Sequence, residues 1–155
     1  MSESIYVYDA QTGKIKYTVD EIHESQVESF QVADGESFYV GPSGQKISGT
    51  FVKKDMETGQ HFGISPIENM VFINLNKHIV VANGTDEAVI SGLRKGMHVD
   101  INHEHSYIVD DESGSTLELS CNNYSYVAQH NEMKVYLKAY GCHDSVISIK
   151  FIEEI

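Results

Sequence analysis

Short runs of β-branched and aromatic residues, separated by Gly, Asp or Asn, are the feature that most limits how this chain folds. Helical periodicity is almost absent. Runs of this kind with turn signals every ~8–12 residues predict an all-β fold, and the later ones predict a β-sandwich. The clearest runs are "SIYVYD", "IKYTV", "VESFQV", "ESFYVGPSG", "KISGTFVKK", "EAVISGL", "MHVDI", "SYIVD", "TLELS", "MKVYLKAY" and "SVISIKF".

The N-terminal region predicts a hairpin. Its two runs flank "QTGK", in which Gly13 tolerates the positive φ of a tight turn. Alternation places five apolar side chains on one set of faces, namely Ile5, Val7, Ile15, Tyr17 and Val19. Between Ser25 and Phe38 we favour a strand, with a short helix as the alternative.

A change of character near Asp55–Pro66 predicts a domain boundary. This stretch, "DMETGQHFGISP", is polar, contains two glycines and ends at one of the chain's two prolines. An apolar β pattern resumes after it. We therefore expect a small β-rich module over residues 1–66 and a β-sandwich over residues 67–155.

Acidic residues dominate the charge of both expected domains. The 155 residues include 23 Asp and Glu and 11 Lys and Arg, for a formal charge of −12. Such a surface repels phosphate backbones and anionic lipid, so we expect neither nucleic acid nor membrane as a partner. The opening "MSESIYVYDA" lacks the basic start and apolar core of a secretory leader, and we expect synthesis in a cytoplasm.

Two stretches of the chain resemble known proteins. The first is "YVYDAQTGKIKYTV" near the start, and the second is "NGTDEAVISGLRKGMHVDINHEHSYIVDDESGSTLELS" together with the final "MKVYLKAYGCHDSVISIKF". The matching motifs of the second stretch are Gly84-Thr85-Asp86, Ala88–Ile90, Gly92-Leu93 with Gly96, Val99–Ile101, Tyr107–Asp111 and Leu117–Leu119. This pattern resembles a small immunoglobulin-like module found in structural proteins of tailed bacteriophages.

The resemblance implies a non-enzymatic virion protein made in the host bacterial cytoplasm. Its N-terminal module would dock on the capsid or tail, and its immunoglobulin-like domain would contact other virion proteins or further copies of itself in a symmetric assembly. The alternative is a module that binds a glycan or protein on the host surface. A metal-dependent hydrolase is the third hypothesis.

Two polar insertions depart from the family pattern. "NHEH" widens one hairpin, and "SCNNYSYVAQHNE" replaces a short turn. Loops on a rigid sandwich often carry recognition. We therefore predict partner contacts at His103, Glu104, His105, Tyr124 and Tyr126.

The histidines near residue 100 raise a second possibility. If the segment were a strand, His103 and His105 would project to one face, and His98 could approach across a hairpin. Imidazoles beside carboxylates can bind a divalent metal. Against this, Met97, Val99 and Ile101 alternate with polar residues, as in a half-buried strand that ends in a solvated turn.

The remaining reactive side chains predict no chemistry. For Cys121 and Cys142 we favour two free thiols, with a disulfide between them as the alternative. "VDDESGS" has only a weak likeness to a calcium loop, because it lacks the alternating Asp spacing and the distal Glu. No phosphate-binding glycine loop or acid–base pair is present in the sequence. We expect no enzymatic activity and no cofactor.

Overall fold

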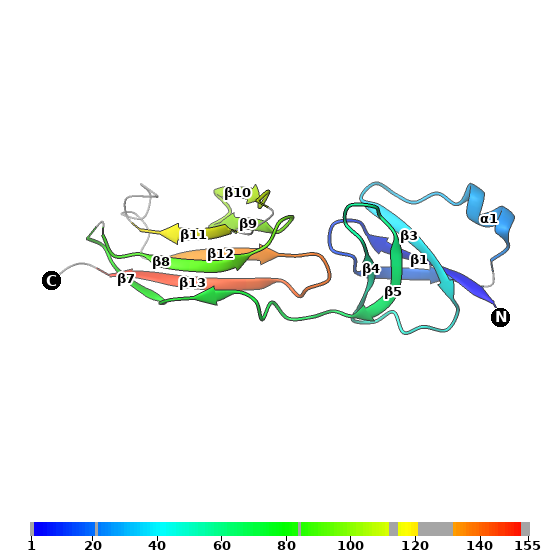
Figure 1. The fold of residues 1–155 in the computed structure, drawn as a ribbon, viewed down its shortest axis with the longest axis horizontal. Helices are drawn as coiled ribbons and strands as arrows, with labels where there is room; N and C mark the ends of the chain where they lie inside the picture. Colours follow the sequence, from blue (N-terminus) through cyan, green and yellow to red (C-terminus); the bar gives the residue numbers. More distant parts are fainter. Residues whose placement is uncertain (1, 21, 84, 112–114, 121–131, 153–155) are drawn as a thin grey trace. The chain divides into compact units, whose positions relative to one another are not determined.

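The computed structural model describes residues 2–20, 22–83, 85–111, 115–120 and 132–152. The fold is all-β, as the sequence predicts, and the described strands form several mainly antiparallel sheets (Figure 1). Two compact units share the chain. Unit 1 comprises Met1–Asn69 and Tyr140–His143, and unit 2 comprises Met70–Ala139 and Asp144–Ile155. Among the described residues, no helix is long and apolar enough to cross a membrane.

A three-stranded antiparallel sheet organises unit 1. Its strand order is β2 (Ile15–Val19), β1 (Glu3–Asp9) and β3 (Glu36–Pro42). The central strand β1 is buried on both faces, because Ile5, Tyr6, Val7 and Tyr8 are all at most 1% exposed. The hairpin of β1 and β2 confirms the prediction from the sequence, and Gly13 has the expected positive φ of 79°.

One detail of this hairpin departs from simple alternation. Ile5 faces Val19 and Val7 faces Tyr17, but the register shifts between Val7 and Tyr8, so that Ile15 pairs with Tyr8. The irregularity moves Ile15 out of the predicted set.

The segment predicted as a strand after Ser25 begins instead with a helix. Helix α1 (Glu24–Ser29) is one short element whose first turn is closed by the His23 and Gln26 side chains in a capping box. None of its residues is buried. The preference for a strand over "VESFQV" was therefore wrong, and the strand that follows, β3, begins only at Glu36.

The predicted linker is a hairpin. Strands β4 (Thr50–Lys54) and β5 (His61–Pro66) pair antiparallel across residues 55–60. Asp55 Oδ1 accepts hydrogen bonds from the amides of Glu57 and Thr58, at 2.8 and 3.2 Å. The polar and glycine residues that suggested a linker thus form an Asx-type turn, because such turns and linkers are rich in the same residue types.

Unit 2 consists of two sheets that enclose one core. The five-stranded sheet has the order β10 (His105–Ile108), β9 (His98–Ile101), β12 (Glu132–Lys138), β13 (Ser145–Ile152) and β7 (Ile79–Val81). The three-stranded sheet has the order β11 (Ser115–Leu119), β8 (Ala88–Leu93) and β6 (Asn74–Leu75). Only β7 and β13 among the described strand pairs run parallel.

This strand order is that of an immunoglobulin-like sandwich. Counted along the chain without the short strand β7, the first, second and fifth strands of unit 2 (β6, β8 and β11) form one sheet. The third, fourth, sixth and seventh (β9, β10, β12 and β13) belong to the other. Alternate residues point inward, and the largest fully buried side chains include Ile90, Ile101, Leu119, Met133 and Leu137. The alternation of Met97, Val99 and Ile101 predicted its part of this core correctly, and "MKVYLKAY", which was expected to be a strand, has the same alternation.

The segment Tyr140–His143 joins β12 to β13 in the sequence, yet it belongs to unit 1. There, Gly141 N donates to Thr12 O at 2.7 Å, and Gly141 O accepts from Glu68 N at 3.0 Å. The Tyr140 hydroxyl donates to a main-chain carbonyl of β4, and burial raises the pKa of this phenol well above its usual range. The first unit therefore has two segments, whereas the sequence suggested one.

Candidate binding site on unit 2

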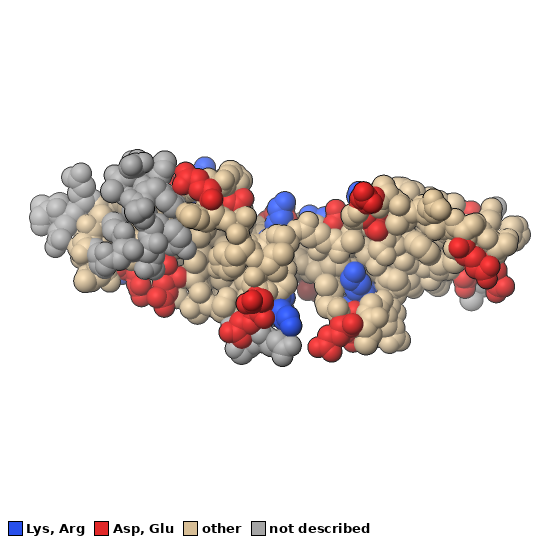
Figure 2. All heavy atoms as spheres, turned by 90° about the horizontal axis from the view of Figure 1, so that it is seen from above, with Lys and Arg blue, Asp and Glu red and all other residues tan. Residues whose placement is uncertain are grey.

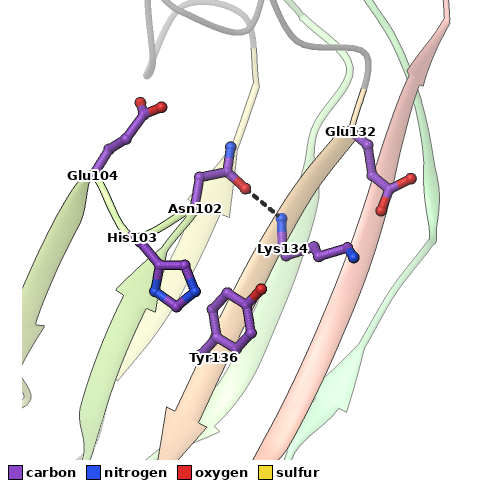
Figure 3. Close-up of a pocket in the computed structure, with 6 residues that line it drawn as sticks. All are labelled: Asn102, His103, Glu104, Glu132, Lys134 and Tyr136. Carbon is purple, nitrogen blue, oxygen red and sulfur yellow. Dashed lines mark hydrogen bonds between the residues drawn. The ribbon is translucent and has the colours of Figure 1, made fainter.

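An open polar pocket lies on the five-stranded sheet at the turn between β9 and β10 (Figure 3). The turn contributes Asn102, His103 and Glu104, and β12 contributes Glu132, Lys134 and Tyr136. All six side chains have polar groups, and two carry aromatic rings. The pocket therefore offers hydrogen-bond donors and acceptors of both charges around a ring surface.

The β12 side of the pocket follows from strand periodicity. Met133, Val135 and Leu137 alternate with the three pocket residues of β12 and are fully buried in the core. Because successive side chains of a strand point to opposite faces, the intervening residues point away from the core. We call this side of the five-stranded sheet its outer face.

The turn side depends on an unusual backbone. Asn102 and His103 have φ values of 53° and 59°, in the left-handed backbone region that residues other than glycine seldom adopt. Glu104 N donates to Ile101 O at 3.0 Å and closes the turn. Two consecutive residues of this kind store backbone strain, which is frequent at functional sites.

Asn102 holds the turn against β12. Its main-chain N–H donates to Lys134 O at 2.9 Å. Its side-chain Oδ1 accepts from Lys134 N at 2.7 Å (Figure 3). The side chain thus replaces one step of the strand ladder just where β9 ends. This pair of bonds places the next residue, His103, beside Tyr136.

His103 is held by a ring and by a carboxylate. Its imidazole stacks on Tyr136 with ring centroids 4.3 Å apart and an angle of 21° between the planes. His103 Nδ1 lies 2.9 Å from Asp100 Oδ2, and the two side chains are 68% and 32% exposed. Such an exposed pair stabilises the fold little, so its main effect is to orient the imidazole.

The other oxygen of Asp100 has no partner among the described residues. Asp100 Oδ1 is buried and accepts no hydrogen bond from them. Buried carboxylate oxygens are normally satisfied, because desolvation without a hydrogen bond costs about 1–3 kcal/mol. This oxygen is therefore an unused acceptor on the carboxylate whose other oxygen contacts His103 Nδ1.

The structure brings together only some of the predicted contact residues. His103 and Glu104 line the pocket, and His105 does not. His105 lies opposite Ile101 in the ladder, whereas His98 lies opposite Ile108. Tyr124 and Tyr126 lie outside the described residues, as does Cys121, while Cys142 is buried in unit 1.

The metal hypothesis fails on the same geometry. The described residues include no group of three or more His, Cys, Asp or Glu side chains that could hold a metal ion. His98 and His105 point to opposite faces of the sheet, since His98 shares the face of Asp100 and His105 shares that of the core residue Ile101. The period-two argument for His103 and His105 was wrong because His103 lies in a turn.

Sequence reasoning passed over half of the pocket. Glu132, Lys134 and Tyr136 were not among the predicted contact residues. The alternation in "EMKVYLK" places these three on one face, so the signal was present. That this face meets the distant turn depends on the pairing of Tyr136 with Asp100, which one sequence does not reveal.

The outer face also exposes apolar residues. Ile79, Ile108, Val146 and Ile152 are 41–56% exposed and lie on β7, β10 and β13. Lys134, Lys138 and Lys150 lie among them, as exposed residues of β12 and β13. Elsewhere, Figure 2 shows carboxylates spread over the visible surface of both units. Half of the six basic residues of the expected second domain thus occupy one sheet face of an acidic protein.

Comparisons of the chain with protein-family models, with curated proteins and with solved structures found no match.

Proposed function

We propose that this chain is a non-enzymatic structural or accessory protein of a tailed-phage virion, and that the outer face of unit 2 contacts another virion protein. The observation that carries the contact surface is the mixture of exposed isoleucine and valine side chains with three lysines on one sheet. Exposed apolar groups bordered by charge are typical of protein interfaces. The phage assignment is supported by the resemblance of the sequence to virion modules.

Particle labelling tests the proposal. Antibodies against the recombinant chain are applied to particles purified from the source lysate and viewed by immunogold electron microscopy. We expect label on the particle. Label on the capsid would assign a decoration protein, and label at the neck, baseplate or fibres would assign a tail component. Unlabelled particles from a lysate that contains the chain would contradict the virion proposal.

A second candidate function is favoured by the pocket. Sugars are bound by an aromatic face together with amide, carboxylate and ammonium groups that bond hydroxyls. Tyr136, Lys134 and Glu132 supply such groups side by side. We therefore propose, as the alternative, that the pocket binds a host-surface glycan.

A glycan array compares the two functions directly. Under the glycan alternative, the wild-type chain binds a defined sugar class, and Tyr136→Ala removes the signal. Tyr17→Ala is the matched control, because Tyr17 is an exposed strand tyrosine of unit 1. No signal on the array for the wild type, or equal signals for both variants, would exclude the pocket as a glycan site.

A further inference from the structure

Strand β7 is the last strand of the five-stranded sheet on the side of β13, as far as the described strands go. Ala82 N donates to Ile152 O at 2.8 Å, so Ala82 directs its backbone N–H toward β13. The backbone groups of successive strand residues alternate between the two sides of the strand. Ile79 and Val81 therefore direct their N–H and C=O groups away from β13.

Both of these backbone groups of Val81 are bonded within the segment that follows β7. Val81 N donates to Asp86 Oδ2 at 2.8 Å, and Val81 O accepts from Asn83 N at 2.8 Å. Natural edge strands are commonly protected by charged side chains. The Asp86 carboxylate thus occupies the donor that an added strand would need at Val81.

Asp86 is held in this position from two sides. Its Oδ1 forms an ion pair with Lys77 Nζ, and its main-chain N–H donates to Asn83 Oδ1 at 2.8 Å. The Lys77 ammonium, together with the Val81 amide, lowers the pKa of the Asp86 carboxyl. The carboxylate therefore remains charged, and remains an acceptor, at neutral pH.

The sequence of β7 indicates what this carboxylate keeps away. Its three residues, Ile79, Val80 and Val81, are all β-branched, and a short run of such residues without Pro or charge is prone to pair with its own copy. When two copies run antiparallel with Val80 at the centre, Ile79 of one copy faces Val81 of the other. Apolar side chains then meet, and the outward N–H of Val81 would bond the Ile79 carbonyl of the second copy.

We propose that Asp86, held by Lys77, closes the β7 edge against antiparallel pairing with β7 of a second copy. The contact that it prevents is isologous, because each copy would present the same edge. The inference does not depend on the virion proposal, since it concerns self-association of the free chain.

Amide hydrogen exchange of the full chain, followed by NMR at a concentration where it is monomeric, tests the closure. In the wild type, Val81 N–H should exchange within about tenfold of the ladder amide of Ala82. Asp86→Ala should speed exchange at Val81 about tenfold or more relative to Ala82. Asp86→Asn keeps a side-chain oxygen and should not. Exchange at Val81 of the wild type as fast as in an unfolded peptide would overturn the proposal.

Sedimentation velocity tests the consequence for self-association. Asp86→Ala should dimerise roughly tenfold more tightly than the wild type, because each copy gains a backbone bond, whereas Asp86→Asn should match the wild type. Adding Ile79→Lys to Asp86→Ala should abolish the gain, since an edge lysine blocks strand addition. Circular dichroism checks that each variant is folded.

Three results would contradict the closure: Asp86→Ala that associates no more than the wild type, Asp86→Asn that associates as tightly as Asp86→Ala, or association that Ile79→Lys does not reduce. Should Asp86→Ala not fold, Lys77→Ala takes its place, because it removes the ion pair and leaves the carboxylate. It should then give a smaller gain in dimerisation that Ile79→Lys again removes, and no gain would count against the proposal.

Discussion

At the scale of single residues, the glycines of "SGLRKG" show what a sequence motif can and cannot reveal. Gly92 lies in β8 at φ +88°, where two β8 residues face one residue of β11 in a bulge. Gly96 lies in the turn between β8 and β9 at φ +90°. Both glycines belong to one motif of the resemblance, but only Gly96 lies in a turn. The sequence does not show that a Cβ at Gly92 would meet a neighbouring backbone.

We predict that Gly92→Ala destabilises unit 2 more than Gly96→Ala does. A Cβ at Gly92 would lie 2.1 Å from Phe72 O, whereas one at Gly96 would meet nothing within 4 Å. Both variants incur the positive-φ penalty of about 1–2 kcal/mol, and only Gly92→Ala must also displace backbone. Urea unfolding followed by circular dichroism measures the difference. Equal losses would show that φ alone matters at both sites.

His61 gives unit 1 a pH-dependent stability. Its Nε2 lies 2.8 Å from the Tyr8 hydroxyl, and burial, together with the nearby Lys54 ammonium, lowers the pKa of the imidazole. The unfolded chain therefore binds a proton below about pH 6.5 that the folded chain resists. Stability contributed by neutral His61 should be lost as the pH falls through this value.

The test compares His61→Gln with His143→Gln, which replaces an exposed histidine of unit 1. Between about pH 7.5 and pH 5, the free energy of unfolding should fall less for His61→Gln than for the wild type. His143→Gln should follow the wild type. A His61→Gln variant with an unchanged pH slope would assign the acid sensitivity to other groups.

At the scale of elements, alternating patterns predicted strands better than turn composition predicted boundaries. "MHVDI" and "MKVYLKAY" have one apolar and one polar face, and both form strands with those faces. "DMETGQHFGISP" was assigned to a linker because hairpin turns and linkers use the same residues. Helix α1 was only the second choice for its segment because it is short and exposed, and it therefore lacks the apolar stripe that marks a packed helix.

The turn between β9 and β10 should depend on Asn102. Asn102→Ala removes the side-chain bond to Lys134 N and places alanine at φ 53°, so we expect a loss of about 1–3 kcal/mol in the stability of unit 2. Asn102→Gly also loses the bond but tolerates the φ, and it should cost less. Urea unfolding measures both. A larger loss for Asn102→Gly would contradict this explanation of the turn.

At the scale of the whole molecule, the sequence predicted the all-β class. The expected boundary was at residue 66, whereas unit 1 comprises Met1–Asn69 and a second segment, Tyr140–His143. Tyr140–His143 joins it through main-chain bonds to Thr12 and Glu68, which are remote in sequence. Nothing in "AYGCHD" indicates these contacts, because a loop with glycine can connect two strands of a hairpin without bonding to another part of the chain. The pocket was half predicted for the same reason: its turn is local, and its β12 side is a tertiary pairing.

The central proposal is that another virion protein covers the outer face of unit 2 in a phage particle. Acetylation of lysines in purified particles and in the free chain, read by mass spectrometry, tests it most directly. We predict that Lys134, Lys138 and Lys150 react less in particles, whereas the exposed Lys53 and Lys95 react equally in both. Equal reactivity of the three outer-face lysines in particles and in the free chain would contradict the claim.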